Sequence, residues 1–192
     1  MPNATTSWIA LLRGINVGGR NRLPMAELRE LFERAGCLEV RTYIQSGNVV
    51  LATGDGTARA ELAERLAAAV EAAKGFRPAV VLLTLDELAA AMEGNPFPKA
   101  TAEPNRLHLW FLADEPDDVD FDALDSLRTP SERFELSGRI LYLHAPDGIG
   151  RSKLAARVER ALGVEATARN WRTVDTLHEM AAESGGSAGS GG

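Results

Sequence analysis

A stretch rich in arginine and glycine near the N-terminus is the part of the sequence best suited to chemistry. The segment from Leu11 to Pro24, LLRGINVGGRNRLP, contains three arginines, three glycines and two asparagines. Guanidinium groups form charge-assisted hydrogen bonds with phosphate and carboxylate oxygens, and glycine lets backbone N–H groups approach an anion closely. We therefore expect this stretch to bind a small molecule that carries phosphate or carboxylate, such as a nucleotide.

A purely structural interpretation of the same residues stays open. Glycines after strands commonly form turns, and loop asparagines commonly hydrogen-bond to nearby backbone. The segment GINVGG is not a GxGxxG fingerprint, and the later segment GIGRSK lacks the spacing and the Lys-Ser/Thr order of a P-loop. The sequence indicates no particular cofactor and no particular reaction, so whether the protein is an enzyme stays open.

Apolar periodicity predicts the elements that must position these residues. In the first half it indicates strand, helix, strand, strand, helix and strand, which is the ferredoxin-like order. The predicted elements are a strand at 8–13, a helix from Pro24 to Gly36, a hairpin with strands at 40–45 and 48–53, a helix at 57–74 and a strand at 77–83.

The second half repeats the same order of elements. We expect a strand at 106–113, a short helix at 119–127, a hairpin with strands at 132–137 and 139–144, a helix at 152–162, a strand at 164–168 and a last helix from Trp171 capped by Asn170. The predicted fold class is α+β, with two small α/β subdomains in tandem. The first is ferredoxin-like, and the second has a similar topology with an extra C-terminal helix.

Domain boundaries follow from these elements and from composition. We expect a ferredoxin-like subdomain at 1–84, a helical linker at 85–105, a second α/β subdomain with its C-terminal helix at 106–183, and a flexible Gly/Ser tail at 184–192. The linker helix starts where Thr84 and Glu87 are spaced as a capping box.

The predicted topology brings separate polar loops together. In the ferredoxin-like order 4-1-3-2, the first and second strands end at the same edge of the sheet, so residues 13–21 should lie beside residues 45–48. In the second subdomain, the ends of the third and fourth strands should bring residues 147–153 near residues 168–170, with the first of these segments leading into a helix N-terminus. The candidate ligand contacts are Arg13, Asn16, Gly18, Gly19, Gln45, Asn48, Ser152, Lys153 and Arg169.

Overall charge argues against a general nucleic-acid binder. The formal net charge is -6, and seven carboxylates fall between Asp114 and Asp125; the remaining 20 acids balance 21 bases. No long basic run is present. Binding of single-stranded nucleic acid, suggested by the ferredoxin-like pattern, is an alternative that is not favoured, because the strand NVVLAT lacks the aromatic residues of RNA-recognition modules. A protein-interaction or oligomeric scaffold without catalysis is a second alternative, and the sequence does not define the oligomeric state.

Other features set limits on site type and location. Cys37 is the one cysteine, so no disulfide and no cysteine-rich metal site is expected. The chain shows no signal peptide and no apolar stretch of membrane-spanning length, which predicts a cytoplasmic protein with no membrane partner. His108 and Trp110 share one face of a predicted strand, where packing between the domains is favoured over base stacking.

Several motifs together give the chain a family resemblance. In order along the sequence they are ALLRGINVGGRN, TYIQSGNVV, NPF, LHLWFL, GRSKL and TARNWRTV. This set resembles the bacterial family of domain of unknown function 1697 from about Trp8 to Leu177. The resemblance implies two linked α/β subdomains, at least the first of them ferredoxin-like. It implies no activity, substrate or catalytic residue, because none is established for that family.

Overall fold

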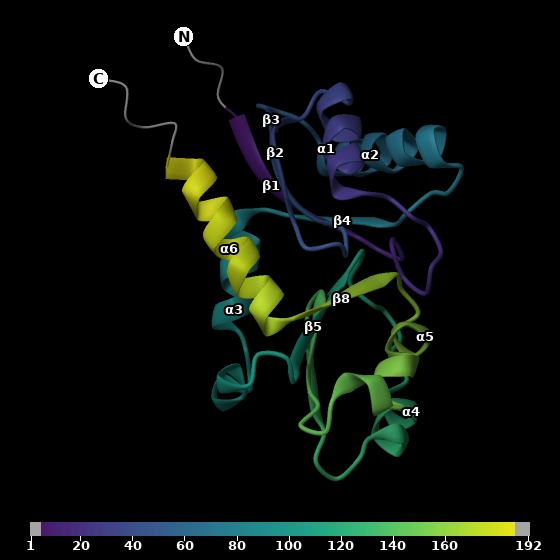
Figure 1. Ribbon diagram of the computed structural model, residues 1–192. Helices are drawn as coiled ribbons and strands as arrows, with labels where there is room; N and C mark the ends of the chain where they lie inside the picture. Colours follow the sequence, from purple (N-terminus) through teal and green to yellow (C-terminus); the bar gives the residue numbers. More distant parts are fainter. Residues whose placement is uncertain (1–4, 187–192) are drawn as a thin grey trace. The chain divides into compact units, whose positions relative to one another are not determined.

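The protein has a mixed α+β fold, and the computed structural model describes residues 5–186 (Figure 1). Within that range it contains six α-helices and two four-stranded antiparallel sheets. The chain divides into two compact units, one made of residues 5–89 and 176–186 and the other of residues 90–175. None of the described helices is long and apolar enough to cross a membrane.

The first unit is a sheet in the order β2-β3-β1-β4 with two helices on one face. Buried side chains of both helices, among them Phe32 and Leu66, share one core with Trp8 and Leu12 of the sheet. Along the chain its elements are β1 (Thr5–Leu12), α1 (Met25–Arg34), β2 (Leu38–Tyr43), β3 (Asn48–Gly54), α2 (Arg59–Lys74) and β4 (Val80–Leu83).

Strand β1 is apolar on both faces. Trp8 faces the helices, where its indole N–H donates to Thr53 Oγ1 at 3.0 Å and the guanidinium of Arg59 lies 5.6 Å from its ring centre. Ile9 and Leu11 point to the other face together with Val50 of β3, and all three are completely buried. This second face carries apolar aliphatic side chains and no aromatic ring on β1 or β3.

The second unit has a sheet in the order β6-β7-β5-β8, again with two helices on one face. Its core joins Trp110 and Leu143 of the sheet to Leu124 and Val158 of the helices. The face with His108 and Trp110, predicted to pack between domains, is thus covered by helices of its own unit. The elements are β5 (Leu107–Leu112), α4 (Phe121–Leu127), β6 (Arg133–Ser137), β7 (Ile140–His144), α5 (Val158–Leu162) and β8 (Ala166–Asn170).

Two further helices, α3 (Leu85–Glu93) and α6 (Trp171–Gly186), each begin in one unit and end in the other. The predicted capping box at the start of α3 is confirmed, because the Glu87 N–H donates to Thr84 Oγ1 at 3.2 Å and the Thr84 N–H donates to the Glu87 carboxylate at 2.9 Å. The predicted cap of α6 is also confirmed, since Asn170 Oδ1 accepts from the Thr173 N–H at 2.9 Å.

The segment predicted as a helix at 152–162 is different in the structure. Two 3₁₀ turns at Ile149–Arg151 and Ala155–Arg157 precede α5, which has only five residues. Leu154 and Val158 are both completely buried, so a tight turn followed by a short helix satisfies the apolar spacing that suggested a longer helix. At the C-terminus, α6 continues through residues 184–186 of the predicted tail, and residues 187–192 of that tail lie outside the described residues.

Candidate functional site

Residues 13–24, which we call the arginine loop, begin with a small hairpin that follows β1. Val17 and Arg20 pair across a two-residue turn, in which the Arg20 N–H donates to the Val17 carbonyl at 3.0 Å. Gly18 and Gly19 have φ values of +58° and +76°, the left-handed conformation that a type I′ turn requires at both central positions. The glycine pair therefore shapes the tip of the loop.

Asn16 holds the base of the arginine loop closed. Its side-chain amide donates to the carbonyls of Leu23 at 2.8 Å and Gln45 at 2.9 Å, and its Oδ1 accepts from the Leu23 N–H at 2.8 Å. A second asparagine, Asn21, donates to the Gly14 carbonyl at 2.9 Å. Both N–H donors of the Asn16 amide are thus used inside the protein.

The predicted proximity of the two loops is confirmed. Besides the bond from Asn16 to Gln45, the Leu12 N–H donates to the Gly47 carbonyl at 2.8 Å. Gly47 has a φ of +77°, and a Cβ built on it would lie 2.8 Å from Leu12 Cβ and 2.9 Å from Ile15 Cδ1. The turn at residues 44–47 is therefore packed directly against the start of the arginine loop.

Backbone strain is present in this same turn. Ile44 has a φ of +46°, and its side chain is 51% exposed. A β-branched residue rarely adopts this conformation, which costs on the order of 1–3 kcal/mol and persists only where the surrounding structure imposes it. Such strain clusters at functional sites, and here it lies next to Gln45, one of the predicted contacts.

Asn48 is buried rather than presented to solvent. Its amide donates to the Tyr43 carbonyl at 3.2 Å and to Ser46 Oγ at 2.9 Å, and its exposed fraction is 0%. These contacts close the β2–β3 turn. Asn48 and Asn16 thus fix the shape of the site, and the groups left to contact a ligand are those of the arginine loop and the exposed Gln45.

The arginines of this loop differ from the other basic residues of the first unit. The side chains of Arg20 and Arg22 are exposed and make no hydrogen bond or ion pair with any described residue. Each remaining lysine or arginine of the unit's described part has a partner. Arg34, Arg41, Arg59, Arg65, Lys74 and Arg77 form ion pairs, Arg29 donates to Thr42 Oγ1, and Arg13 also has a partner.

The second predicted cluster is arranged differently. Ser152 Oγ accepts from the Ala155 N–H at 3.0 Å, so Ser152 binds the first residue of a 3₁₀ turn and is not at the N-terminus of a regular helix. Lys153 beside it is exposed. Arg169 lies on β8 and alternates with Ala168, which packs in the core under α4 and α5. Arg169 therefore points to the opposite face of the sheet from the segment that contains Ser152 and Lys153.

Arg169 itself is a buried cation. Its exposed fraction is 9%, and its guanidinium donates to Thr167 Oγ1 and to the Ala168 carbonyl, each at 2.8 Å. Desolvation by burial lowers its pKa to about 10, so it stays charged at neutral pH. We interpret these contacts as a structural role for the side chain.

The described residues offer little for metal or nucleophilic chemistry. They contain no group of three or more His, Cys, Asp or Glu side chains able to hold a metal ion. Cys37 is buried, and desolvation raises the pKa of its thiol above the ordinary value, with a smaller opposing effect of Arg65. At neutral pH the thiol is therefore protonated and shielded from solvent, which is unlike a catalytic cysteine.

His108 makes the stability of the fold depend on pH. It is 8% exposed, its Nδ1 has no hydrogen-bond partner among the described residues, and burial lowers its pKa from 6.5 to about 4. Below pH 6.5 the unfolded chain binds a proton that the folded chain excludes until about pH 4. Stability is therefore lost as the pH falls through this range, and the loss at pH 5 relative to pH 8 is about 2 kcal/mol.

Urea unfolding of the full chain at pH 8 and pH 5 measures this effect, with His108→Gln as the matched variant. The variant keeps a neutral polar side chain and removes the titrating group, so its loss of stability between the two pH values should be smaller by about 2 kcal/mol. Equal losses of stability in the wild type and the variant would show that protonating His108 costs no free energy in the folded protein.

Comparison with known proteins places the chain in a family. The family model described as "Protein of unknown function (DUF1697)" matches residues 5–142. The chain belongs to the DUF1697 family. No curated protein matches it. Among solved structures, this DUF1697 chain is similar to the conserved bacterial protein SP0830 from Streptococcus pneumoniae, with 25% identity, a TM-score of 0.72, and coverage of 93% of this chain and 99% of that one.

Two features of this DUF1697 protein had no decisive sequence signal. The strained φ of Ile44 depends on how the turn packs, and a β-branched residue predicts the reverse. Arg157 and Arg160 line an open cavity between α4 and α5. Their spacing of three residues could have drawn attention to them, but it is also the spacing of an ordinary solvated helix face.

Proposed function

We propose that this DUF1697 protein binds a phosphate- or carboxylate-bearing small molecule at the arginine loop. The observation that carries the proposal is the pair Arg20 and Arg22, two exposed guanidinium groups without a partner in a unit whose other described lysines and arginines each have one. Guanidinium groups match phosphate and carboxylate oxygens in charge and in geometry. An anion bound here would complete their hydrogen bonding.

Backbone groups at the loop tip support the same proposal. The N–H groups of Gly18 and Gly19 make no hydrogen bond with the described residues. Both glycines are exposed, and a Cβ added to either would have no neighbouring atom within 4 Å. An anion can therefore reach these two N–H donors without a steric obstacle. Because Asn16 and Asn21 hold the loop in shape, little ordering entropy would oppose binding.

We also infer that both units have the ferredoxin-like topology. The two strand orders, β2-β3-β1-β4 and β6-β7-β5-β8, support this inference, since each places its first and third strands at the centre and its second and fourth at the edges. We further infer a cytoplasmic location, with which a single free, buried thiol at Cys37 is consistent.

Thermal unfolding with AMP as the probe tests the proposed function. For the full chain, AMP at 100 times its dissociation constant should stabilise the fold by about 2.7 kcal/mol, measured at constant ionic strength. The double variant Arg20→Ala/Arg22→Ala should lose most of this stabilisation. Arg34→Ala is the matched control, because Arg34 is an exposed arginine of the same unit that pairs with Glu30 on α1.

Equal stabilisation of wild type, double variant and control would contradict binding at the arginine loop. A single-stranded oligonucleotide in place of AMP tests the nucleic-acid alternative. That alternative lacks the aromatic stacking surface of RNA-recognition modules, since the face of β1 and β3 that carries Ile9, Leu11 and Val50 has no aromatic side chain. Strong, salt-dependent binding of the oligonucleotide without any effect of AMP would favour it.

A further inference from the structure

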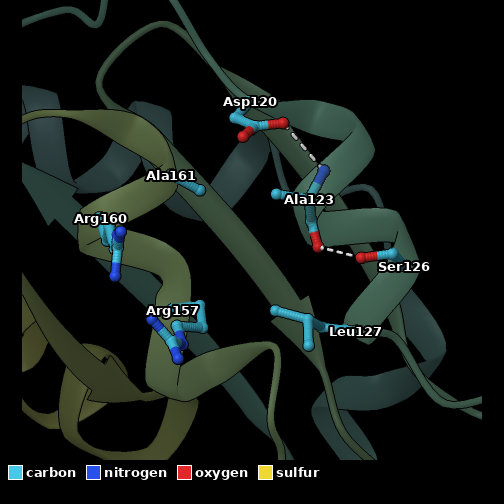
Figure 2. A pocket seen from close by; sticks show the side chains of 7 residues that line it. All are labelled: Asp120, Ala123, Ser126, Leu127, Arg157, Arg160 and Ala161. Atoms are coloured by element: carbon cyan, nitrogen blue, oxygen red, sulfur yellow. Dashed lines mark hydrogen bonds between the residues drawn. The ribbon is translucent and has the colours of Figure 1, made fainter.

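The second unit contains an open cavity of about 500 Å³ between α4 and α5 (Figure 2). Its walls are joined by a backbone hydrogen bond in which the Asp120 N–H donates to the Ala161 carbonyl at 3.0 Å. The volume lies within the range typical of small-molecule sites, roughly 300–1,000 Å³.

Two cations line one wall of this cavity. Arg157 ends the 3₁₀ turn immediately before α5 and Arg160 lies within α5, and both side chains line the cavity (Figure 2). Both are exposed, and neither side chain forms a hydrogen bond or an ion pair with a described residue. Two adjacent guanidinium groups repel each other, and a bound anion would remove that repulsion.

The polar groups of the opposite wall are already engaged. The Asp120 carboxylate accepts from the Ala123 N–H at 2.9 Å and caps α4, and the Ser126 hydroxyl donates to the Ala123 carbonyl at 2.8 Å (Figure 2). The side chains of Ala123, Leu127 and Ala161 add apolar surface to the lining. A molecule in the cavity would thus meet two free cations on one side, and on the other apolar carbon together with the engaged Asp120 carboxylate and Ser126 hydroxyl.

We propose that this cavity is a second binding site, for a phosphate monoester with a small apolar body. A phosphate monoester dianion has two negative charges and three terminal oxygens, against one charge and two oxygens for a carboxylate, so it matches the charge of two guanidinium groups and offers them more acceptor positions. The apolar body contacts Leu127 and Ala161. This site lies wholly within the second unit and does not depend on the function proposed for the arginine loop.

An NMR titration of the full-length, ¹⁵N-labelled chain with phenyl phosphate tests the second site. We expect the amide signals of Ala123, Leu127 and Ala161 to shift with a common dissociation constant. Inorganic phosphate, which lacks the apolar body, should bind at least fivefold more weakly. Benzoate, which has the apolar body but only a carboxylate, should also bind at least fivefold more weakly.

Two variants separate the charged part of the site from its apolar part. Arg157→Ala/Arg160→Ala should weaken phenyl phosphate binding at least tenfold. Ala123→Leu leaves every charge in place and fills the cavity with a residue of similar helix propensity, so it should have a comparable effect. Arg151→Ala is the control, because Arg151 is another exposed arginine of this unit that does not line the cavity, and it should change binding less than twofold.

Specific outcomes would overturn the second site. The proposal fails if 10 mM phenyl phosphate leaves the three amides unmoved, or if Arg151→Ala weakens binding as much as the double variant. It fails equally if inorganic phosphate or benzoate binds as tightly as phenyl phosphate. Loss of AMP binding in Arg20→Ala/Arg22→Ala has no bearing on these readings, so the two sites can fail separately.

Discussion

Replacing Gly47 by alanine is expected to lower the free energy of unfolding by about 3 kcal/mol, from left-handed strain and overpacking together. Gly47 has a φ of +77°, a conformation that costs a residue with a Cβ about 1–2 kcal/mol. The new Cβ would lie 2.8 Å from Leu12 Cβ and 2.9 Å from Ile15 Cδ1. Both neighbours are buried, at 1% exposure, so neither can move aside easily. Urea denaturation of the full chain measures the change.

Gly56→Ala is the matched control for Gly47→Ala. Gly56 has a φ of +79°, nearly the same as that of Gly47, but nothing lies within 4 Å of a built Cβ. In the control, the free energy of unfolding should therefore fall by only about 1 kcal/mol, from the strained backbone conformation alone. The structure predicts a larger loss of stability for Gly47→Ala. Similar losses of stability in the two variants would show that the turn at residues 44–47 is not packed tightly against Leu12 and Ile15.

Replacing Asn16 by aspartate is expected to destabilise the protein by about 2–3 kcal/mol, with no ligand present. Aspartate has the same shape and also tolerates a positive φ, which is +53° at this position. It loses the two bonds donated to the carbonyls of Leu23 and Gln45 and brings a negative charge to both oxygens. It keeps an oxygen that can accept from the Leu23 N–H. Urea denaturation again supplies the measurement.

The same variant separates a structural role of Asn16 from a direct ligand contact. Asn21→Asp is the control, because Asn21 also has a positive φ, of +51°, and donates a single side-chain bond, to the Gly14 carbonyl. Its expected cost is about 1 kcal/mol. If Asn16→Asp left stability unchanged and altered only ligand binding, the amide would be a ligand contact and its three internal bonds would be energetically irrelevant.

Much of the fold could be predicted because local sequence signals agree with the tertiary structure. Alternating and helical apolar patterns placed the eight strands in order, and the caps at Thr84 and Asn170 were visible from residue type alone. The segment at 152–162 could not be resolved in this way. Buried residues at Leu154, Val158 and Leu162 fit a continuous helix and a turn followed by a short helix equally well.

The candidate site could be predicted only as a set of neighbouring loops. Strand order was enough to bring residues 13–21 beside residues 45–48, as the bond from Asn16 to the Gln45 carbonyl shows. Residue type alone could not decide whether Asn16 and Asn48 face a ligand or the backbone, since an amide is equally suited to both. The sequence also could not show that the Arg20 side chain has no partner while other arginines of the unit form ion pairs. An ion pair depends on which carboxylates lie close by in the folded structure.

An amide-resolved NMR titration of the full chain with AMP shows whether the arginine loop binds an anion. We expect the largest shift changes at the N–H groups of Gly18, Gly19 and Arg20, and their loss in Arg20→Ala/Arg22→Ala while the rest of the spectrum stays unchanged. If millimolar AMP leaves these signals in place, or moves them equally in the double variant, the arginine loop is not the binding site.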